Sequence, residues 1–394
     1  MKYKRIFGIV LDSVGVGNAP DAQTFNDQGS DTIKHVGEAF QGELKLPNLG
    51  KLGLANLHGE EILGVPKQPA PKAFYGKMNE QSVGKDSMDG HWEMMQLPVM
   101  KHLSFFPDGF PDDLLDQISK FSGRKIVGNK AESGTKIIEE FGEHQMQTGD
   151  LIIYTSGDSV LQIAAHEEII PLEELYKICE YARTLVNGPK YVVGRIIARP
   201  YVGNGKGDFT RTANRHDYAL LPFGETSLDK LQQAGVKTYG IGKIGDIFSN
   251  KGLDVLYHNE SNMDGMDHVD EVMKEDFTGF CFTNLVDFDA MYGHRRNPIG
   301  FGNALMDFDK RLGTVLDNLQ KDDLLIITAD HGNDPGFTGS DHTREQVPLI
   351  AYSPSMAAGG DLGVRSTFAD FGATVLDNFD VAGSEVGTSF LNDL

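Results

Sequence analysis

The chain has 394 residues, a formal net charge of -21 and only two cysteines. The acidic balance argues against general binding to nucleic acid or to anionic membranes, because both favour a basic surface, and the length suits two domains or one large α/β domain with an insertion. Cys179 and Cys281 lie in apolar or helical patterns, so we expect buried free thiols. No segment is long and apolar enough to span a bilayer, and the N-terminus lacks the apolar region of a secretion signal, so we expect a cytoplasmic protein without membrane or nucleic-acid partners.

Short apolar runs alternate with helical patterns over much of the chain, which is typical of a mainly parallel sheet with helices on both faces. Strands are predicted at 5–11, 236–241, 279–286, 323–328 and 347–352. The clearest helix is 302–319, whose apolar residues follow the three-and-four spacing of one buried face. A second helix is predicted near 225–234, where Gly235 ends it.

The middle of the chain, 101–219, has a different pattern and is predicted to be an inserted α+β domain of about 120 residues, within the usual domain size. It contains predicted helices at 111–121 and 171–187, a strand near 151–154 and a β-rich stretch at 190–202. The flanking segments, 1–100 and 220–394, are expected to form one catalytic core. Because candidate site residues occur on both sides of the insertion, the insertion is most simply a cap over that site.

Carboxylate and imidazole side chains occur directly after the predicted strands. These residues are Asp12, Asp289, His294, Asp330, His331 and His342. In open α/β sheets ligands bind beyond the carboxyl ends of the strands, so we expect the six side chains to meet at one edge of the sheet. Three Asp and three His can hold two divalent cations, and this mixture suits Mn²⁺, Zn²⁺ or Fe²⁺ better than Ca²⁺ or a thiolate-bound structural zinc.

Ser87 is the candidate nucleophile. It lies in the segment 84–93, Gly-Lys-Asp-Ser-Met-Asp-Gly-His-Trp-Glu, at the start of a predicted helix from Met88 to Met95. Free N–H groups at a helix N-terminus can hold a phosphoryl oxygen, and a coordinating metal would lower the pKa of the hydroxyl. The alternative is that Ser87 only caps the helix. His91 and Trp92 are expected to be structural.

Two further features bear on the ligand. Gly15 and Gly17 follow the first strand, but the third glycine of a dinucleotide fingerprint is absent, so we reject a nucleotide-cofactor site there. Between Arg195 and His216 the chain is locally basic, with Asp208 as the only acid in that stretch. A basic island in an acidic protein favours a small anionic substrate.

Several segments together resemble one known family, the bacterial phosphopentomutases. The Asp-His elements alone would indicate only the alkaline phosphatase superfamily, whereas Gly-Lys-Asp-Ser followed by Gly-His-Trp-Glu is much more specific. The likeness spans nearly the whole chain. The resembling segments are 12–17, 84–87, 90–93, 284–289, 330–334 and 341–345, together with 154–160, 195–200 and 211–218 in the predicted insertion.

This resemblance implies an alkaline-phosphatase-like α/β core and an isomerase that interconverts α-D-ribose 1-phosphate, or its 2-deoxy form, with the 5-phosphate, using two Mn²⁺ ions. By analogy, one ion would bind Asp12, Asp330 and His331, and the other would bind Asp289, His294 and His342. The nucleophile of the family is usually threonine, and Ser87 stands in its place. Losing the methyl group frees a rotamer and could change how readily the phosphorylated form hydrolyses.

We therefore expect phosphorylated Ser87 to donate its phosphoryl group to a pentose monophosphate, giving a 1,5-bisphosphate, and then to recover the other phosphate. A sugar bisphosphate would act as the activating primer. Arg195, Arg211 and Lys243 are predicted to hold the distal phosphate, and Asp158 is predicted to bind a sugar hydroxyl. The rival hypotheses are a phosphatase or a phosphoglycerate-type mutase on the same core, and a catalytically silent metal-binding protein.

Overall fold

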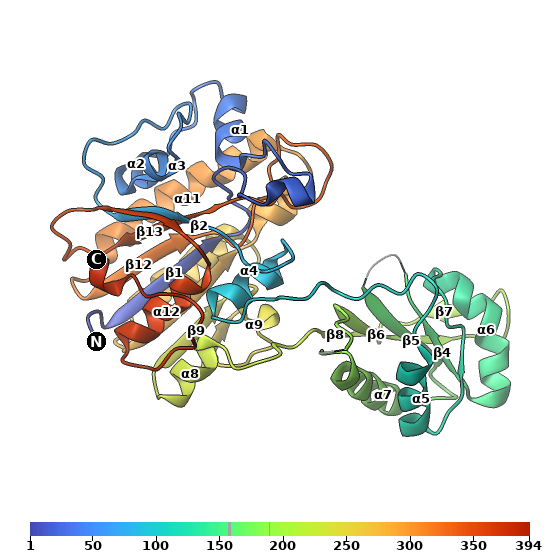
Figure 1. The fold of residues 1–394 in the computed structure, drawn as a ribbon. Coiled ribbons are helices and arrows are strands. Elements are labelled where there is room, and N and C mark those ends of the chain that lie inside the picture. The colour runs from blue at the N-terminus through green and yellow to red at the C-terminus, as the bar shows by residue number, and fades with distance from the viewer. Residues whose placement is uncertain (157–158, 189) are drawn as a thin grey trace. The chain divides into compact units, whose positions relative to one another are not determined.

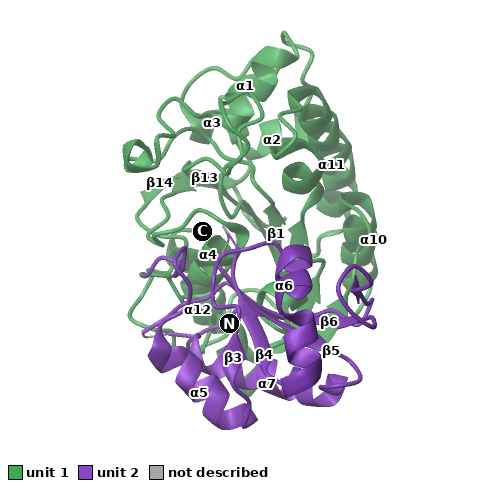
Figure 2. Ribbon diagram, turned by 90° about the vertical axis from the view of Figure 1, so that its right-hand side faces the viewer, with its two compact units in different colours: residues 1–100, 224–394 green, residues 101–223 purple. Residues whose placement is uncertain are grey.

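The computed structural model describes residues 1–156, 159–188 and 190–394 (Figure 1). The chain forms two compact units, which Figure 2 shows in separate colours. The core unit contains residues 1–100 and 224–394, and the inserted unit contains residues 101–223. Both ends of the inserted unit therefore connect to the core unit.

The core unit is built on one eight-stranded sheet, in the order β10-β9-β11-β1-β12-β13-β2-β14. Its strands are β1 (Arg5–Leu11), β2 (Phe74–Met78), β9 (Lys237–Ile241), β10 (Val255–Tyr257), β11 (Gly279–Leu285), β12 (Asp323–Thr328), β13 (Val347–Tyr352) and β14 (Asp361–Arg365). Within this sheet, β13 runs antiparallel to β12 and β2, and the other neighbouring pairs are parallel. The predicted, mainly parallel sheet is confirmed.

Helices cover both faces of this sheet. On one face α10 (Asn262–Met273), α1 (Thr32–Ala39) and α2 (Pro47–Leu52) pack against the long helix α11 (Pro298–Asn318). On the other face α4 (Ser87–Met94) and α8 (Ser227–Gln233) pack against α12 (Ala369–Asn378), and α9 (Ile244–Ile247) lies beside α4 (Figure 1). The remaining elements of this unit are α3 (Leu54–His58), the 3-10 turns Ala22–Phe25 and Leu391–Asp393, and a short π-helix, η2 (Phe288–Gly293).

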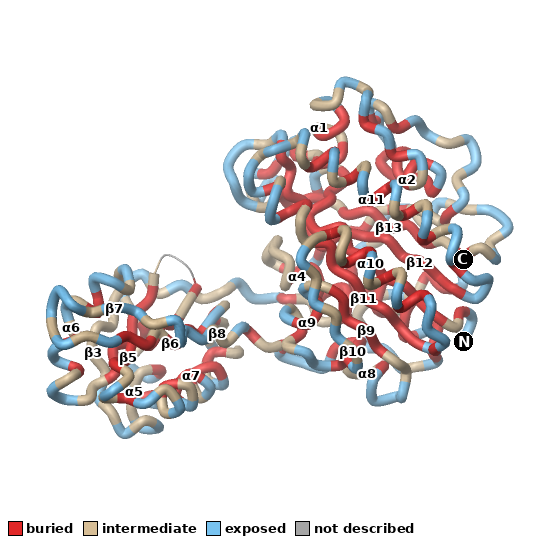
Figure 3. The backbone as a smooth tube through the Cα atoms, turned by 180° about the vertical axis from the view of Figure 1, so that it is seen from behind, coloured by how far each residue is buried: buried red, intermediate tan, exposed pale blue. Residues whose placement is uncertain are grey.

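The three central strands, β11, β1 and β12, are buried along their whole length, and Figure 3 shows β11 and β12 in red. Because helices cover both faces, these strands are continuous apolar runs rather than alternating ones. Their parallel register places Val10 opposite both Asn284 and Thr328. The three strands thus end side by side, and the loops that follow them start at one edge of the sheet.

The inserted unit has its own six-stranded sheet, with β3 (Ile126–Val127), β4 (Leu151–Tyr154), β5 (Val160–His166), β6 (Arg195–Val202), β7 (Thr210–Arg211) and β8 (His216–Ala219). Alternate residues of β4 enter different apolar clusters, as expected for a strand between two layers. Leu151 and Ile153 pack in the cluster of α5 (Asp112–Ser122) and α7 (Leu172–Leu185), whereas Ile152 and Tyr154 pack in that of α6 (Gly134–Thr148). The inserted unit therefore has two apolar layers of its own.

Two smaller expectations concern the thiols and the membrane. Cys179 and Cys281 are buried and free, as predicted, and burial raises the pKa of both thiols. In the part of the chain that the structure describes, no helix combines the length and apolar character needed to cross a bilayer.

Candidate active site and metal centre

The six predicted metal ligands lie in loops that leave the same edge of the core sheet. Asp12 directly follows β1, and Asp330 and His331 follow its neighbour β12. On the other side of β1, the chain leaves β11 into η2, which carries Asp289. The structure therefore brings these predicted residues together from segments more than 270 residues apart in the chain.

A first cluster contains Asp12, Asp330 and His331, which offer ligand atoms that all lie within 4.8 Å of one another. The His331 Nε2 atom lies 3.5 Å from Asp12 Oδ1 and 3.4 Å from Asp330 Oδ2. Both of those carboxylate oxygens are buried and accept no hydrogen bond of good geometry from the described residues, although His91 Nδ1 lies 3.3 Å from Asp330 Oδ2. A buried, unpaired carboxylate oxygen is costly, and a cation would satisfy both.

A second cluster contains Asp289, His294 and His342. The Asp289 carboxylate lies 3.1 Å from His294 Nε2 and 3.4 Å from His342 Nε2, and the two Nε2 atoms are 3.1 Å apart. The His331 ring stacks on the His342 ring with 3.9 Å between centroids, so His331 also groups with Asp289 and His342. The two clusters are adjacent, and their division into two separate ion sites stays a prediction.

The three imidazoles share one orientation. Each Nδ1 faces a main-chain carbonyl: His294 faces Ser340 at 2.8 Å, His331 faces Gly332 at 3.0 Å, and His342 faces Lys85 at 2.9 Å. Because a carbonyl can only accept, each Nδ1 carries a proton, so Nε2 is the nitrogen of each ring that can bind a metal ion. This is the arrangement of metal-binding histidines, whose second nitrogen is held by a carbonyl or carboxylate.

The electrostatics of the first cluster also favour a cation. Burial, followed by repulsion from Asp330 and Asp289, raises the pKa of Asp12 well above its usual value. Asp12 Oδ2 accepts a hydrogen bond from Asn284 at 2.9 Å, which opposes that rise. Several carboxylates in a buried space repel one another unless positive charge is added, so this donor set fits divalent metal ions.

Ser87 lies beside the first cluster. It is the first residue of α4, and its Oγ lies 3.1 Å from His331 Nε2. When that Nε2 carries no proton, the serine hydroxyl can donate to it. The alternative that Ser87 only caps the helix is wrong, because the N-cap is Asp86, whose carboxylate accepts from the N–H groups of Met88 and Asp89. The Ser87 hydroxyl is therefore not used in capping.

Two further residues support the site: His91, which was expected to be structural, and Asn284, which sequence reasoning missed. His91 donates from Nδ1 to the Ser87 carbonyl at 2.7 Å, and its Nε2 lies 3.3 Å from Asn284 Nδ2. Asn284 also donates to Asp12, so a continuous chain of hydrogen bonds links the Ser87 carbonyl to Asp12, a predicted metal ligand. The only sequence signal was a polar residue near the end of an otherwise apolar strand.

The predicted substrate-binding residues are spread over both units. Arg195 and Arg211 lie on β6 and β7 of the inserted unit, whereas Lys243 is an exposed residue at the start of α9 in the core unit. Arg195 is paired with Asp217 at 3.3 Å. The fourth predicted residue, Asp158, lies outside the described residues.

Comparison with known proteins identifies the family. A model of the Metalloenzyme superfamily matches residues 4–382. The chain is 71% identical over 394 residues to the phosphopentomutase of Levilactobacillus brevis, and the match covers 100% of both chains. It is 68% identical over 395 residues to the phosphopentomutase of Limosilactobacillus reuteri, covering 100% of this chain and 99% of that one. The chain belongs to the bacterial phosphopentomutases.

Membership in the phosphopentomutase family confirms the predicted resemblance and makes the chain an enzyme, an isomerase. The hypothesis of a catalytically silent protein is therefore wrong. The superfamily match and the two Asp/His clusters agree on a metal cofactor. A solved phosphoglycerate mutase from Leishmania mexicana, 12% identical, has the same fold, with a TM-score of 0.51 over 98% of this chain and 97% of that one. The alkaline-phosphatase-like fold is thus confirmed.

Proposed function

We propose that this protein interconverts α-D-ribose 1-phosphate, or its 2-deoxy form, with the 5-phosphate through a phosphorylated Ser87. The names of its close relatives support the pentose phosphate substrate. The main support for this mechanism is the distance of 3.1 Å from Ser87 Oγ to His331 Nε2. His331 groups with both Asp/His clusters. A hydroxyl so placed is available to carry a phosphoryl group between substrate molecules.

The reaction consists of two phosphoryl transfers. In the first, an oxygen of the sugar monophosphate forms a bond to phosphorus as the Ser87 Oγ–P bond breaks, and the hydroxyl proton of the sugar passes to Oγ. The product is a ribose 1,5-bisphosphate. In the second, Ser87 Oγ forms a bond to the other phosphorus, and the released sugar oxygen takes the proton. Each cycle therefore ends with the enzyme phosphorylated, and a sugar bisphosphate can prime it.

Two manganese ions are our assignment for the metal. One ion would be held by Asp12, Asp330 and His331, and the other by Asp289, His294 and His342. The ligand atoms would be the histidine Nε2 atoms and the carboxylate oxygens that accept no hydrogen bond. When bound, the ions would neutralise charge on the phosphoryl oxygens and lower the pKa of the serine hydroxyl. The chain's own part is to hold Ser87 and those ligands in fixed positions.

The substrate's distal phosphate is assigned to Arg195, Arg211 and Lys243, and a sugar hydroxyl to Asp158. Three positive charges near one side chain of the inserted unit support this: those of Arg199, Arg211 and Arg215 each lower the pKa of Tyr154, against the larger effect of burial. We assign the inserted unit the role of a cap that excludes water. Water at the site would hydrolyse the phosphoserine and turn a mutase into a phosphatase.

The test is a coupled assay of ribose 5-phosphate formation from ribose 1-phosphate, for wild type and Ser87→Ala, with metal content measured on both. We expect Ser87→Ala to keep its metal and lose turnover. Full turnover in the alanine variant would remove Ser87 from the mechanism. Release of free phosphate in place of ribose 5-phosphate by the wild type would favour a phosphatase.

A further inference from the structure

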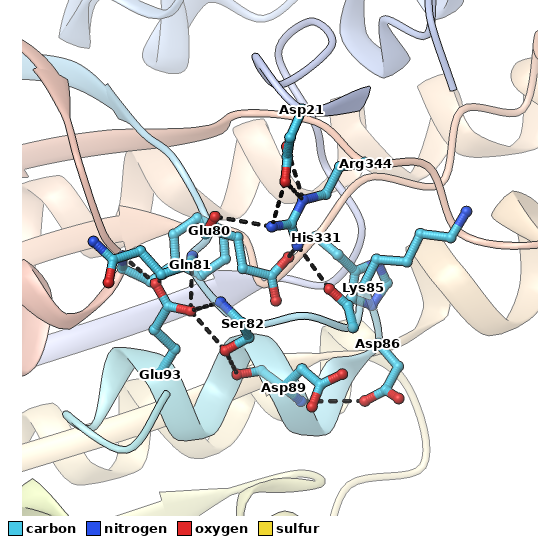
Figure 4. A network of polar contacts seen from close by, with 12 residues as sticks. Asp21, Glu80, Gln81, Ser82, Lys85, Asp86, Asp89, Glu93, His331 and Arg344 are labelled. Carbon is cyan, nitrogen blue, oxygen red and sulfur yellow. Dashed lines mark hydrogen bonds and ion pairs between the residues drawn. The ribbon is translucent and has the colours of Figure 1, made fainter. Parts of the chain in front are cut away.

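The segment that leads to Ser87 has no regular secondary structure. We call residues 79–86, which connect β2 to α4, the nucleophile loop. At the start of this loop, the Glu93 carboxylate accepts hydrogen bonds from the N–H groups of Gln81 and Ser82, at 2.6 to 3.0 Å (Figure 4). The later part of the loop, next to Ser87, needs a different support.

That support is the side chain of Arg344, which is only 2% exposed. Its Nη1 donates to the Gly84 carbonyl at 2.6 Å, and its Nη2 donates to the Glu80 carbonyl at 2.9 Å. One guanidinium thus joins two points of the nucleophile loop that are four residues apart. Figure 4 shows Arg344 beside Glu80. The planar fork of arginine can make such paired bonds, and a lysine ammonium cannot.

The same guanidinium is fixed by two carboxylates. It lies 2.6 Å from Glu80 Oε2, and its Nε and Nη2 donate to Asp21 at 3.0 to 3.2 Å. Glu80 is itself buried, with a side-chain exposure of 1%. Charge-assisted bonds of this length hold the Arg344 side chain in one position, and the pair with Glu80 is shielded from water, whereas Asp21 is 44% exposed.

Arg344 also belongs to the segment that supplies a predicted metal ligand. Two residues earlier, His342 Nδ1 donates to the carbonyl of Lys85, the residue after Gly84. The main-chain N–H of Arg344 donates to Asp27 Oδ2 at 2.8 Å, and Lys85 Nζ contacts the same oxygen at 2.8 Å. Segment 342–344 therefore holds two consecutive carbonyls of the nucleophile loop, just before Ser87.

We propose that Arg344 is a positioning residue that sets the distance from Ser87 to the metal ligands by fixing the Gly84 and Glu80 carbonyls. The proposal rests on the proposed role of Ser87 as nucleophile. Segment 342–344 keeps its own place without the guanidinium, because Thr343 donates its N–H to the Gly332 carbonyl at 2.9 Å and Arg344 N–H reaches Asp27. Removing the guanidinium should thus release the loop while the metal ligands stay.

Two variants separate positioning from folding. Arg344→Lys keeps a positive charge beside Glu80 but loses the paired bonds to the carbonyls. The double variant Arg344→Met with Glu80→Gln removes both charges, which avoids leaving a buried carboxylate unpaired. The matched control is Arg5→Met with Asp323→Asn. Arg5 is equally buried, binds Asp323 through Nε and Nη2 at 2.7 Å, and donates to two main-chain carbonyls. It lies at the start of β1, whereas the candidate site lies beyond the other end of that strand.

The quantity measured is the rate of phosphate transfer from ribose 1,5-bisphosphate to Ser87. The manganese-loaded enzyme is mixed with the bisphosphate, the reaction is quenched at set times, and the phosphorylated fraction is read from the intact mass. Metal content and the KM for ribose 5-phosphate are measured alongside. We expect both Arg344 variants to transfer phosphate about 100-fold more slowly, since a misplacement of about 1 Å costs that much. Metal content and KM should match wild type, and the control variant should transfer at the wild-type rate.

Three results would overturn the proposal: wild-type transfer rates in both Arg344 variants, loss of metal in those variants, or an equal slowing in the control. Failure of the wild type itself to accept phosphate on Ser87 is a different result. It would refute the proposed function, and with it the basis of the proposal.

Discussion

The buried carboxylate of Glu345 should make the stability of the protein fall as pH rises. Glu345 is 1% exposed and accepts hydrogen bonds from the N–H and Oγ of Thr32 and from Thr343 Oγ1, at 2.7 to 2.9 Å. A Cβ on Gly15 or Gly332 would lie only 2.1 or 2.6 Å from its oxygens, so both loops pack on it without side chains. Burial, followed by repulsion from Asp334, raises the pKa of Glu345 from 4.5 to about 7.

The sign follows from proton binding. Between 4.5 and about 7 the folded protein holds a proton on Glu345 that the unfolded chain has released, so the free energy of unfolding decreases as pH rises through this range. At 1.36 kcal/mol for each pH unit, the full contribution is about 3 kcal/mol. Most of this loss should occur between about pH 5 and about pH 8.

The perturbation is Glu345→Gln, which cannot ionise. Urea unfolding of the metal-free protein at several pH values gives the difference in free energy of unfolding between variant and wild type. We expect this difference to shift in favour of the variant by about 2 to 3 kcal/mol from about pH 5 to about pH 8. Glu385→Gln, at an exposed position, is the matched control. A difference that stays constant with pH for Glu345→Gln would mean that Glu345 has the same pKa in the folded and unfolded protein.

Three further predictions concern the site and the core. His294→Ala should reduce bound manganese, measured by elemental analysis after dialysis, from two ions per chain to one, and retention of both would contradict the ligand assignment. Gly90→Ala should lower the free energy of unfolding in urea by about 1 to 3 kcal/mol, because the new Cβ would lie 2.1 Å from the Asp330 carbonyl oxygen. This cost exceeds the gain from the higher helix propensity of alanine. An unfolding free energy higher than that of wild type would show that α4 can shift to make room. Arg5→Met should cost about 3 to 5 kcal/mol in the same measurement, and adding Asp323→Asn should recover part of that loss; no recovery would exclude an unpaired buried charge as the cause.

The sequence predicted the strands that are buried on both faces. Strands β1, β11 and β12 are apolar throughout because both of their faces are covered, and the polar residues at their ends are therefore conspicuous. The same pattern does not encode strand direction, so nothing in residues 347–352 indicated that β13 is antiparallel. Strand β2 was missed because its half-buried sequence, Phe-Tyr-Gly-Lys-Met, lacks a clear apolar run.

The residues that meet in the candidate site could be predicted from sequence, whereas the residues that support them could not. Asp12 and Asp330 stand at strand ends, where the chain itself marks their position. Arg344 and Glu345 look like surface residues in any local window, yet both are buried by partners about 260 to 320 residues away. Such partnerships arise only when distant loops meet, so a single sequence carries little trace of them.

If Ser87 carries the phosphoryl group beside the two clusters, the phosphate can be located on it. The manganese-loaded wild type is incubated with ribose 1,5-bisphosphate, digested, and its phosphopeptides are sequenced by mass spectrometry. We predict one phosphate per chain, on Ser87, that disappears when excess ribose 5-phosphate is added. An enzyme that turns over at full rate with no phosphate on Ser87 at any stage would contradict this role of Ser87.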